Sequence, residues 1–210
     1  MVGSSSGPFP MTSPFRGILV TRSRERIRRA CGESGRVRLR ASAFAVWVAL
    51  VVACVATFGA SMDALVSSLG CAVLVAVTVT DLERRIVPNR IVVPALVVAL
   101  LVQTARDPSV EWVVSAVAAG SFFLALALVY PAGLGMGDVK LAAFLGAWLG
   151  RDVAVALFVG TLLGALPAIA VLLRRGTAGR KVTLPYVPAL AAGAVVALFF
   201  GDAVLEAWLG

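Results

Sequence analysis

Two short acidic motifs carry the side chains best suited to chemistry in this sequence. The first starts at Asp81 and reads DLERRIVPN, and the second reads GMGDVK and contains Asp138. Two carboxylates held close together share one proton, because like charges at short range cannot both ionise. The ionised partner can take a proton from an attacking water while the protonated one donates to a carbonyl oxygen. These residue types predict amide hydrolysis if the fold brings the two acids together.

The remaining composition narrows the chemistry further. The chain has no histidine, which excludes Ser-His and Cys-His nucleophiles and His-ligated metals. Its three cysteines, Cys31, Cys54 and Cys71, are far apart and form no CxxC pair, zinc pattern or disulfide framework. We interpret them as small buried hydrophobes. The sequence predicts no metal and no cofactor.

The apolar content is that of a membrane protein. Of the 210 residues, 60% are hydrophobic and 14% are charged, whereas soluble domains carry about 25% charged residues. We therefore predict an all-α fold, a polytopic transmembrane helix bundle of about seven spans, with six to eight compatible with the pattern. The fifth apolar segment is short, and it either tilts or merges with the sixth around residues 150–152. The seven segments are 41–60, 63–80, 89–104, 112–131, 139–149, 153–173 and 184–208.

Basic residues predict the domain organisation and the orientation. Residues 1–40 form a basic arm with nine arginines, which we interpret as disordered or lying on anionic lipid, and residues 41–210 form the membrane domain. The arm is no cleavable signal peptide, and its charge indicates lipid and not nucleic acid as partner. With the N-terminus in the cytoplasm, 17 basic residues fall on the cytoplasmic side and 2 on the other. Asp81 and Asp138 then both lie at the cytoplasmic edge, and the other loop acids lie opposite (Asp63, Asp107, Glu111, Asp152 and Asp202).

Each acidic motif also has a plainer structural explanation. Arg84 and Arg85 serve as interface anchors, and Asp138 could cap a helix that begins at Val139. Asp81 is harder to explain in this way, because it closes an apolar helix where the macrodipole disfavours an anion by roughly 0.3–1 kcal/mol. Asp138 opens a helix, where the dipole favours the anion. We therefore expect Asp138 to be the ionised base and Asp81 the protonated acid.

The two motifs together resemble those of the type IV prepilin peptidases, the GxGD-type membrane aspartyl proteases. The resemblance covers about residues 63–200 and includes the late segment 184–190, LPYVPAL. It implies that Asp81 and Asp138 are catalytic, in a bacterial cytoplasmic membrane protein that removes the basic leader of a prepilin or pseudopilin. Larger family members carry an added domain and also N-methylate the product. This chain resembles the short form, so no methylation is expected.

The resemblance also suggests how substrate is held. Gly135 and Gly137 lack side chains, so they would let an extended substrate backbone approach the acids. Glu83 is the nearest acid that could attract a basic leader. The sequence leaves homo-oligomer formation open.

Three other interpretations compete with this one. A proton-coupled transporter uses paired intramembrane acids as a relay, but such proteins usually show two similar halves, and no internal repeat is present here. An inactive scaffold of a pilus assembly would not need both aspartates and the glycines. The presenilin and signal-peptide-peptidase group shares GxGD, although its first aspartate normally follows a tyrosine and here follows Thr80.

Overall fold

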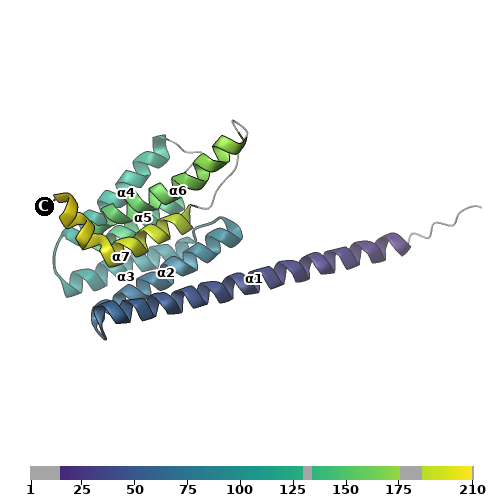
Figure 1. Cartoon of the computed structure of the whole chain (residues 1–210), viewed down its shortest axis with the longest axis horizontal. Helices are drawn as coiled ribbons and strands as arrows, with labels where there is room; N and C mark the ends of the chain where they lie inside the picture. The colour runs from purple at the N-terminus through teal and green to yellow at the C-terminus, as the bar shows by residue number, and fades with distance from the viewer. Residues whose placement is uncertain (1–14, 130–133, 176–185, 210) are drawn as a thin grey trace, which may run out of the picture. The chain divides into compact units, whose positions relative to one another are not determined.

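The structure, a computed structural model, describes residues 15–129, 134–175 and 186–209, and every regular element in these ranges is a helix. This confirms the predicted all-α class. Figure 1 shows helices α2 to α7 as a bundle. In chain order the elements are α1 (Phe15–Phe58), α2 (Met62–Arg84), α3 (Asn89–Arg106), α4 (Glu111–Val129), α5 (Met136–Leu149), the 3₁₀ turn η1 (Gly150–Asp152), α6 (Val153–Arg175) and α7 (Val187–Leu209).

Residues 15–40 of the basic arm belong to helix α1. A helical arm departs from the disordered alternative and leaves the other, a segment lying on anionic lipid, as a prediction. By its internal contacts the chain divides into two units, 1–40 and 41–210. Arginine is among the better helix formers, and no proline interrupts residues 15–40, so a helix nucleated by the apolar part can extend into them. Residues 1–14 lie outside the described part of the chain.

Helices α5 and α6 are separate, and a merged helix at residues 150–152 is wrong. Gly150 adopts φ +60°, a left-handed conformation that ends α5, and η1 leads into α6. With 14 residues, α5 is about 21 Å long, less than the roughly 30 Å of a hydrocarbon core. Six stretches of the described chain are long and apolar enough to cross a membrane, and α5 and α6 fall within one of them. Seven spans therefore stay a prediction.

Small residues set the closest helix contacts. Gly146 of α5 lies against the backbone of Ser115 and Ala116 in α4, and Gly193 of α7 lies against Ala156 and Gly160 in α6. In lipid, helices gain nothing by hiding apolar surface from each other, so they associate by close van der Waals packing, which small residues permit. The pairs α4–α5 and α6–α7 accordingly have the most extensive contacts.

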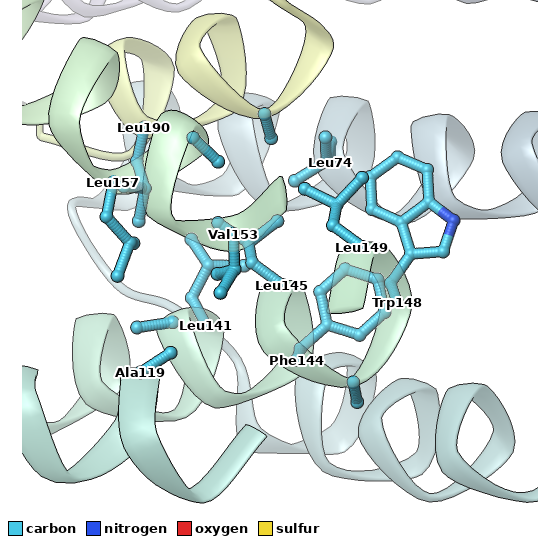
Figure 2. Close-up of a cluster of buried hydrophobic side chains, with 14 of the residues drawn as sticks. Leu74, Ala119, Leu141, Phe144, Leu145, Trp148, Leu149, Val153, Leu157 and Leu190 are labelled. Atoms are coloured by element: carbon cyan, nitrogen blue, oxygen red, sulfur yellow. The ribbon is translucent and has the colours of Figure 1, made fainter. Parts of the chain in front are cut away.

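Helix α5 occupies the centre of the bundle, and this explains its unbroken apolar sequence. Leu141, Leu145 and Trp148 are buried among side chains of four other helices. Figure 2 shows this cluster, with Leu74 from α2, Ala119 from α4, Leu157 from α6 and Leu190 from α7 around the α5 residues. The position of α5 therefore fixes the position of its first turn, which carries Asp138.

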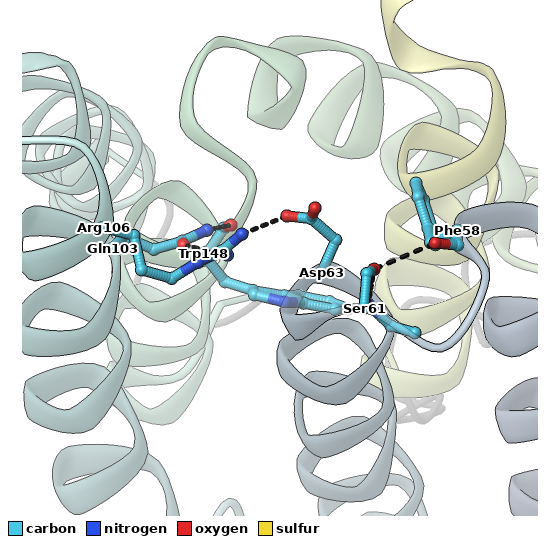
Figure 3. A network of polar contacts seen from close by, with 7 residues as sticks. Phe58, Ser61, Asp63, Gln103, Arg106 and Trp148 are labelled. Atoms are coloured by element: carbon cyan, nitrogen blue, oxygen red, sulfur yellow. Dashed lines mark hydrogen bonds and ion pairs between the residues drawn. The ribbon is translucent and has the colours of Figure 1, made fainter.

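The end of the bundle away from the two motifs contains two ion pairs. Arg106 forms an ion pair with Asp63, and it also donates to Gln103, whose side-chain amide donates to the Trp148 carbonyl at 2.8 Å (Figure 3). Arg151 bonds Asp202 at 3.1 Å. The acids predicted to share one side lie at this end, because α2, α4 and α6 begin here and α3 and α7 finish here. Which membrane side it faces stays a prediction.

The glycine contacts predict which alanine substitutions the bundle tolerates. A Cβ at Gly146 would collide with the Ser115 backbone, and one at Gly193 with the Ala156 carbonyl. Gly146→Ala and Gly193→Ala should each destabilise the protein by about 1–3 kcal/mol, as overpacking does. Gly120→Ala is the matched control, because its Cβ would come no closer than 3.1 Å to a neighbour, the Ala143 Cβ. Thermal unfolding in detergent measures the difference, and equal midpoints for all three variants would contradict the packing.

Candidate active site

Asp81 lies in the last turn of α2 and is only 7% exposed. Its own backbone carbonyl accepts a 2.7 Å hydrogen bond from the Arg85 N–H, and Arg85 adopts the left-handed conformation (φ 54°) that ends the helix. The carboxylate oxygen Oδ2 is buried and has no hydrogen-bond partner within the described chain. A buried acid oxygen without a donor is costly, and such groups are typical of functional sites.

Asp138 is the third residue of α5 and is half-buried. Its Oδ2 accepts from the Gly135 N–H at 3.1 Å, while its own N–H donates to the Gly135 carbonyl at 3.0 Å. The helix begins at Met136, earlier than the predicted Val139, and Asp138 caps it from inside the first turn. The plainer explanation of Asp138 as a cap is therefore correct, and it leaves the second carboxylate oxygen available.

The fold brings the two predicted acids together. The carboxylates of Asp81 and Asp138 are close enough for their charges to repel. The two acids are 57 residues apart in sequence and come from the end of α2 and the start of α5. The fold thus places a second acid near Asp81, as the sequence predicted.

The start of α7 also lies near the two acids, and sequence reasoning gave it no role. The backbone N–H of Val187, the first residue of α7, lies near enough to the Asp81 carboxylate to favour its anion. The preceding residue, Tyr186, lies near Asp138: burial raises the pKa of its phenol, the hydrogen bond with Thr161 lowers it, and the charge of Asp138 raises it. The only signal in the sequence was the LPYVPAL segment, whose Leu184 and Pro185 lie outside the described residues.

The two glycines of GMGD have different surroundings. A Cβ at Gly137 would lie 2.6 Å from the Val87 Cβ, so this glycine allows α5 to approach the turn between α2 and α3. This contact with Val87 gives Gly137 a packing role, and its contact with substrate stays a prediction. Gly135 is exposed, and a Cβ there would come no closer than 3.5 Å to another group, the Asp138 carboxylate. Substrate contact at Gly135 stays a prediction.

Two further polar residues lie at the end of the bundle that holds Asp81 and Asp138. Lys140 donates to the Asn89 side chain at 3.0 Å, which ties the first turns of α5 and α3 together. Glu83 is half-buried in the last turn of α2. Its predicted attraction for a basic leader stays a prediction.

Residues that could hold a metal do not gather anywhere in the described chain. No group of three or more His, Cys, Asp or Glu side chains is found there. Two of the cysteines that are distant in sequence do meet: Cys54 and Cys71 are both buried, as predicted, and their thiols contact each other as free cysteines.

The fold and the site define a helical membrane bundle that carries two neighbouring acids at one end. The family model described as the type IV leader peptidase family matches residues 68–169, a range that includes both aspartates. The chain is 33% identical over 159 residues to a protein of Bacillus subtilis and 36% identical over 160 residues to one of Burkholderia pseudomallei, both named prepilin leader peptidase/N-methyltransferase. The chain therefore belongs to the type IV leader peptidase family.

The similarity covers part of each relative. It includes 72% of this chain and 62% of the Bacillus subtilis protein, and 73% of this chain and 52% of the Burkholderia pseudomallei protein. A protein of Stutzerimonas stutzeri with the same name is 31% identical over 65% of this chain and 50% of its own length. The chain thus spans between about half and three fifths of these relatives. No solved structure matches it.

The Gly137–Val87 contact predicts unequal effects of substitution in the GMGD motif. Gly137→Ala should push the first turn of α5 away from Val87 and displace Asp138, lowering the thermal midpoint and any activity of the protein. Gly135→Ala is the matched control, because 3.5 Å is ordinary van der Waals contact, and it should leave the midpoint nearly unchanged. Thermal unfolding of both variants in detergent tests this, and a Gly135→Ala protein that is the less stable of the two would refute the assignment.

Proposed function

We propose that this chain is an aspartyl endopeptidase of the bacterial cytoplasmic membrane that removes the leader of type IV prepilins or pseudopilins. The observation that carries the proposal is the approach of Asp81 to Asp138 from two separate helices, with one oxygen of Asp81 buried and unpartnered. The names of the relatives supply the substrate class, a prepilin. The many basic residues of the arm and the neighbouring loops support a cytoplasmic position for the site.

The pair would hydrolyse the peptide bond without a metal. Asp138, whose anion is stabilised by the Gly135 N–H and the start of α5, takes a proton from water as the water oxygen attacks the scissile carbonyl carbon. Asp81 gives its proton to the carbonyl oxygen, which yields a neutral tetrahedral diol. The proton on Asp138 then passes to the leaving nitrogen as the C–N bond breaks. A hydroxyl proton of the diol returns to Asp81, and the pair is restored.

The transporter interpretation does not fit this geometry. Proton-coupled carriers place their acids near the bilayer midplane, between repeated halves. Asp81 and Asp138 instead occupy the last turn of one helix and the first turn of another. That position is suited to a substrate whose cleavage point lies at the membrane edge.

The proposal predicts that each acid is needed for processing. Co-expressed with a candidate prepilin, Asp81→Asn and Asp138→Asn should each slow leader removal at least about 100-fold, the usual contribution of a general acid or base. Asp202→Asn is the matched control, because Asp202 is an exposed acid of the same bundle that bonds Arg151 at the opposite end. Gel mobility of the pilin measures processing, and normal cleavage by both site variants would overturn the proposal.

The proton assignment has a separate test. If Asp81 carries the shared proton, isotope-edited infrared spectra of the resting protein should show a carboxylic-acid band that disappears in Asp81→Asn and persists in Asp138→Asn. The physical reason is that Asp138 already accepts a backbone hydrogen bond while Asp81 has a buried oxygen without a donor. A band lost in Asp138→Asn but kept in Asp81→Asn would reverse the two roles.

A further inference from the structure

Tyr186 and Thr161 form a pair of hydroxyl groups beside the two acids. Their oxygens are 3.0 Å apart and join the start of α7 to the middle of α6. The Tyr186 ring is held on two sides: it packs against Phe123 at a centroid distance of 6.3 Å, and Gly164 leaves room for it, since a Cβ there would lie 2.8 Å from the ring. The ring is therefore fixed in place by contacts that do not involve the hydroxyl.

One hydroxyl hydrogen of this pair has no acceptor within the described chain. Two hydroxyls carry two hydrogens, and the bond between them uses one. Elsewhere in the bundle, helical hydroxyls donate to a carbonyl of the preceding turn, as Thr57, Ser68 and Thr80 do. Thr161 instead faces Tyr186. When Thr161 donates to the phenol oxygen, the phenol hydrogen is the one left over.

Tyr186 directly precedes α7, which starts at the end of the bundle that holds the acids. It is near enough to Asp138 for that charge to act on the phenol, and the backbone N–H of the next residue, Val187, acts on Asp81. Two consecutive residues at the start of α7 thus lie near the two carboxylates.

A peptide cleaved at this site needs a hydrogen-bond donor. Proteolysis requires an extended backbone, and a carbonyl released from a helix at the membrane edge loses its partner at a cost of a few kcal/mol in apolar surroundings. Thr161 is also the one polar residue in the lining of an apolar groove of about 700 Å³ between α4 and α6, which includes Ala119, Phe122 and Leu157. The apolar part of a substrate lying in that groove would bring its backbone to the hydroxyl pair.

We infer that Tyr186, oriented by Thr161, donates a hydrogen bond to a backbone carbonyl of the substrate next to the scissile bond. This inference rests on the proposed function, since it gives that substrate a binding contact. The contact is made to the backbone, so it holds substrates regardless of the side chain at that position. Tyr186 is a substrate-binding residue in this role, and Thr161 is a positioning residue.

Kinetics with a purified prepilin test the contact. Tyr186→Phe keeps the ring and removes the hydroxyl, and it should raise KM about twofold to tenfold, the range for one neutral hydrogen bond, with kcat and the thermal midpoint unchanged. Thr161→Val should have a smaller effect of the same kind. The double variant should match Tyr186→Phe alone, because both changes affect a single donor. An unchanged KM, or a loss confined to kcat, would overturn the inference.

Binding without cleavage separates this inference from the proposed function. In an Asp81→Asn background, Tyr186→Phe should weaken the binding of the same prepilin by a similar factor, measured by fluorescence anisotropy of the labelled prepilin. Equal affinity with and without the hydroxyl, or no binding in the Asp81→Asn background, would overturn the contact whatever the activity assay shows. Normal processing after the loss of both aspartates would overturn the proposed function. The binding measurement would still decide whether Tyr186 contacts the prepilin.

Discussion

The short helix α5 is enclosed by its neighbours, and the glycines that permit this enclosure also fix the position of Asp138. Gly146 lets α5 approach the α4 backbone, Gly70 of α2 receives the Trp148 ring, and Gly137 receives Val87. Helices in lipid associate by such close fits, because burying apolar surface against apolar tails gives no other gain. A helix held at three places along its length cannot slide, so packing along the whole of α5 sets the position of its first turn.

Two acids at the end of the bundle away from the two motifs are paired. Asp63 is paired with Arg106 and Asp202 with Arg151, and the buried amide of Gln103 is bonded. Such ion pairs stabilise helix ends and loops. A buried carboxylate oxygen without a partner among the described residues occurs at both ends, on Asp81 and on Asp152. What distinguishes Asp81 is therefore the second acid, Asp138, that lies near it.

The sequence predicted what depends on local pattern, and it could not predict what depends on the fit between distant segments. Apolar runs of helical length indicated α2 to α7, and the two motifs pointed to Asp81 and Asp138. The donors at Val187 and Tyr186 have no local signature, because a backbone N–H is present at every residue but proline and only the fold aims this one. The packing role of Gly137 was missed for the same reason: it depends on Val87, 50 positions earlier in the chain.

The start of α7 changes the electrostatic surroundings of Asp81. From the sequence, the acids differ because Asp81 ends a helix and Asp138 begins one, a dipole difference of about 1 kcal/mol or less. In the structure the backbone N–H of Val187, at the start of α7, also favours the Asp81 anion, so part of that difference is cancelled. What still distinguishes the two is local bonding. Asp138 has its Gly135 donor, whereas Asp81 has a buried oxygen without a partner in the described chain, where a negative charge is costly. This difference in bonding, which only the fold supplies, supports the proposed proton on Asp81.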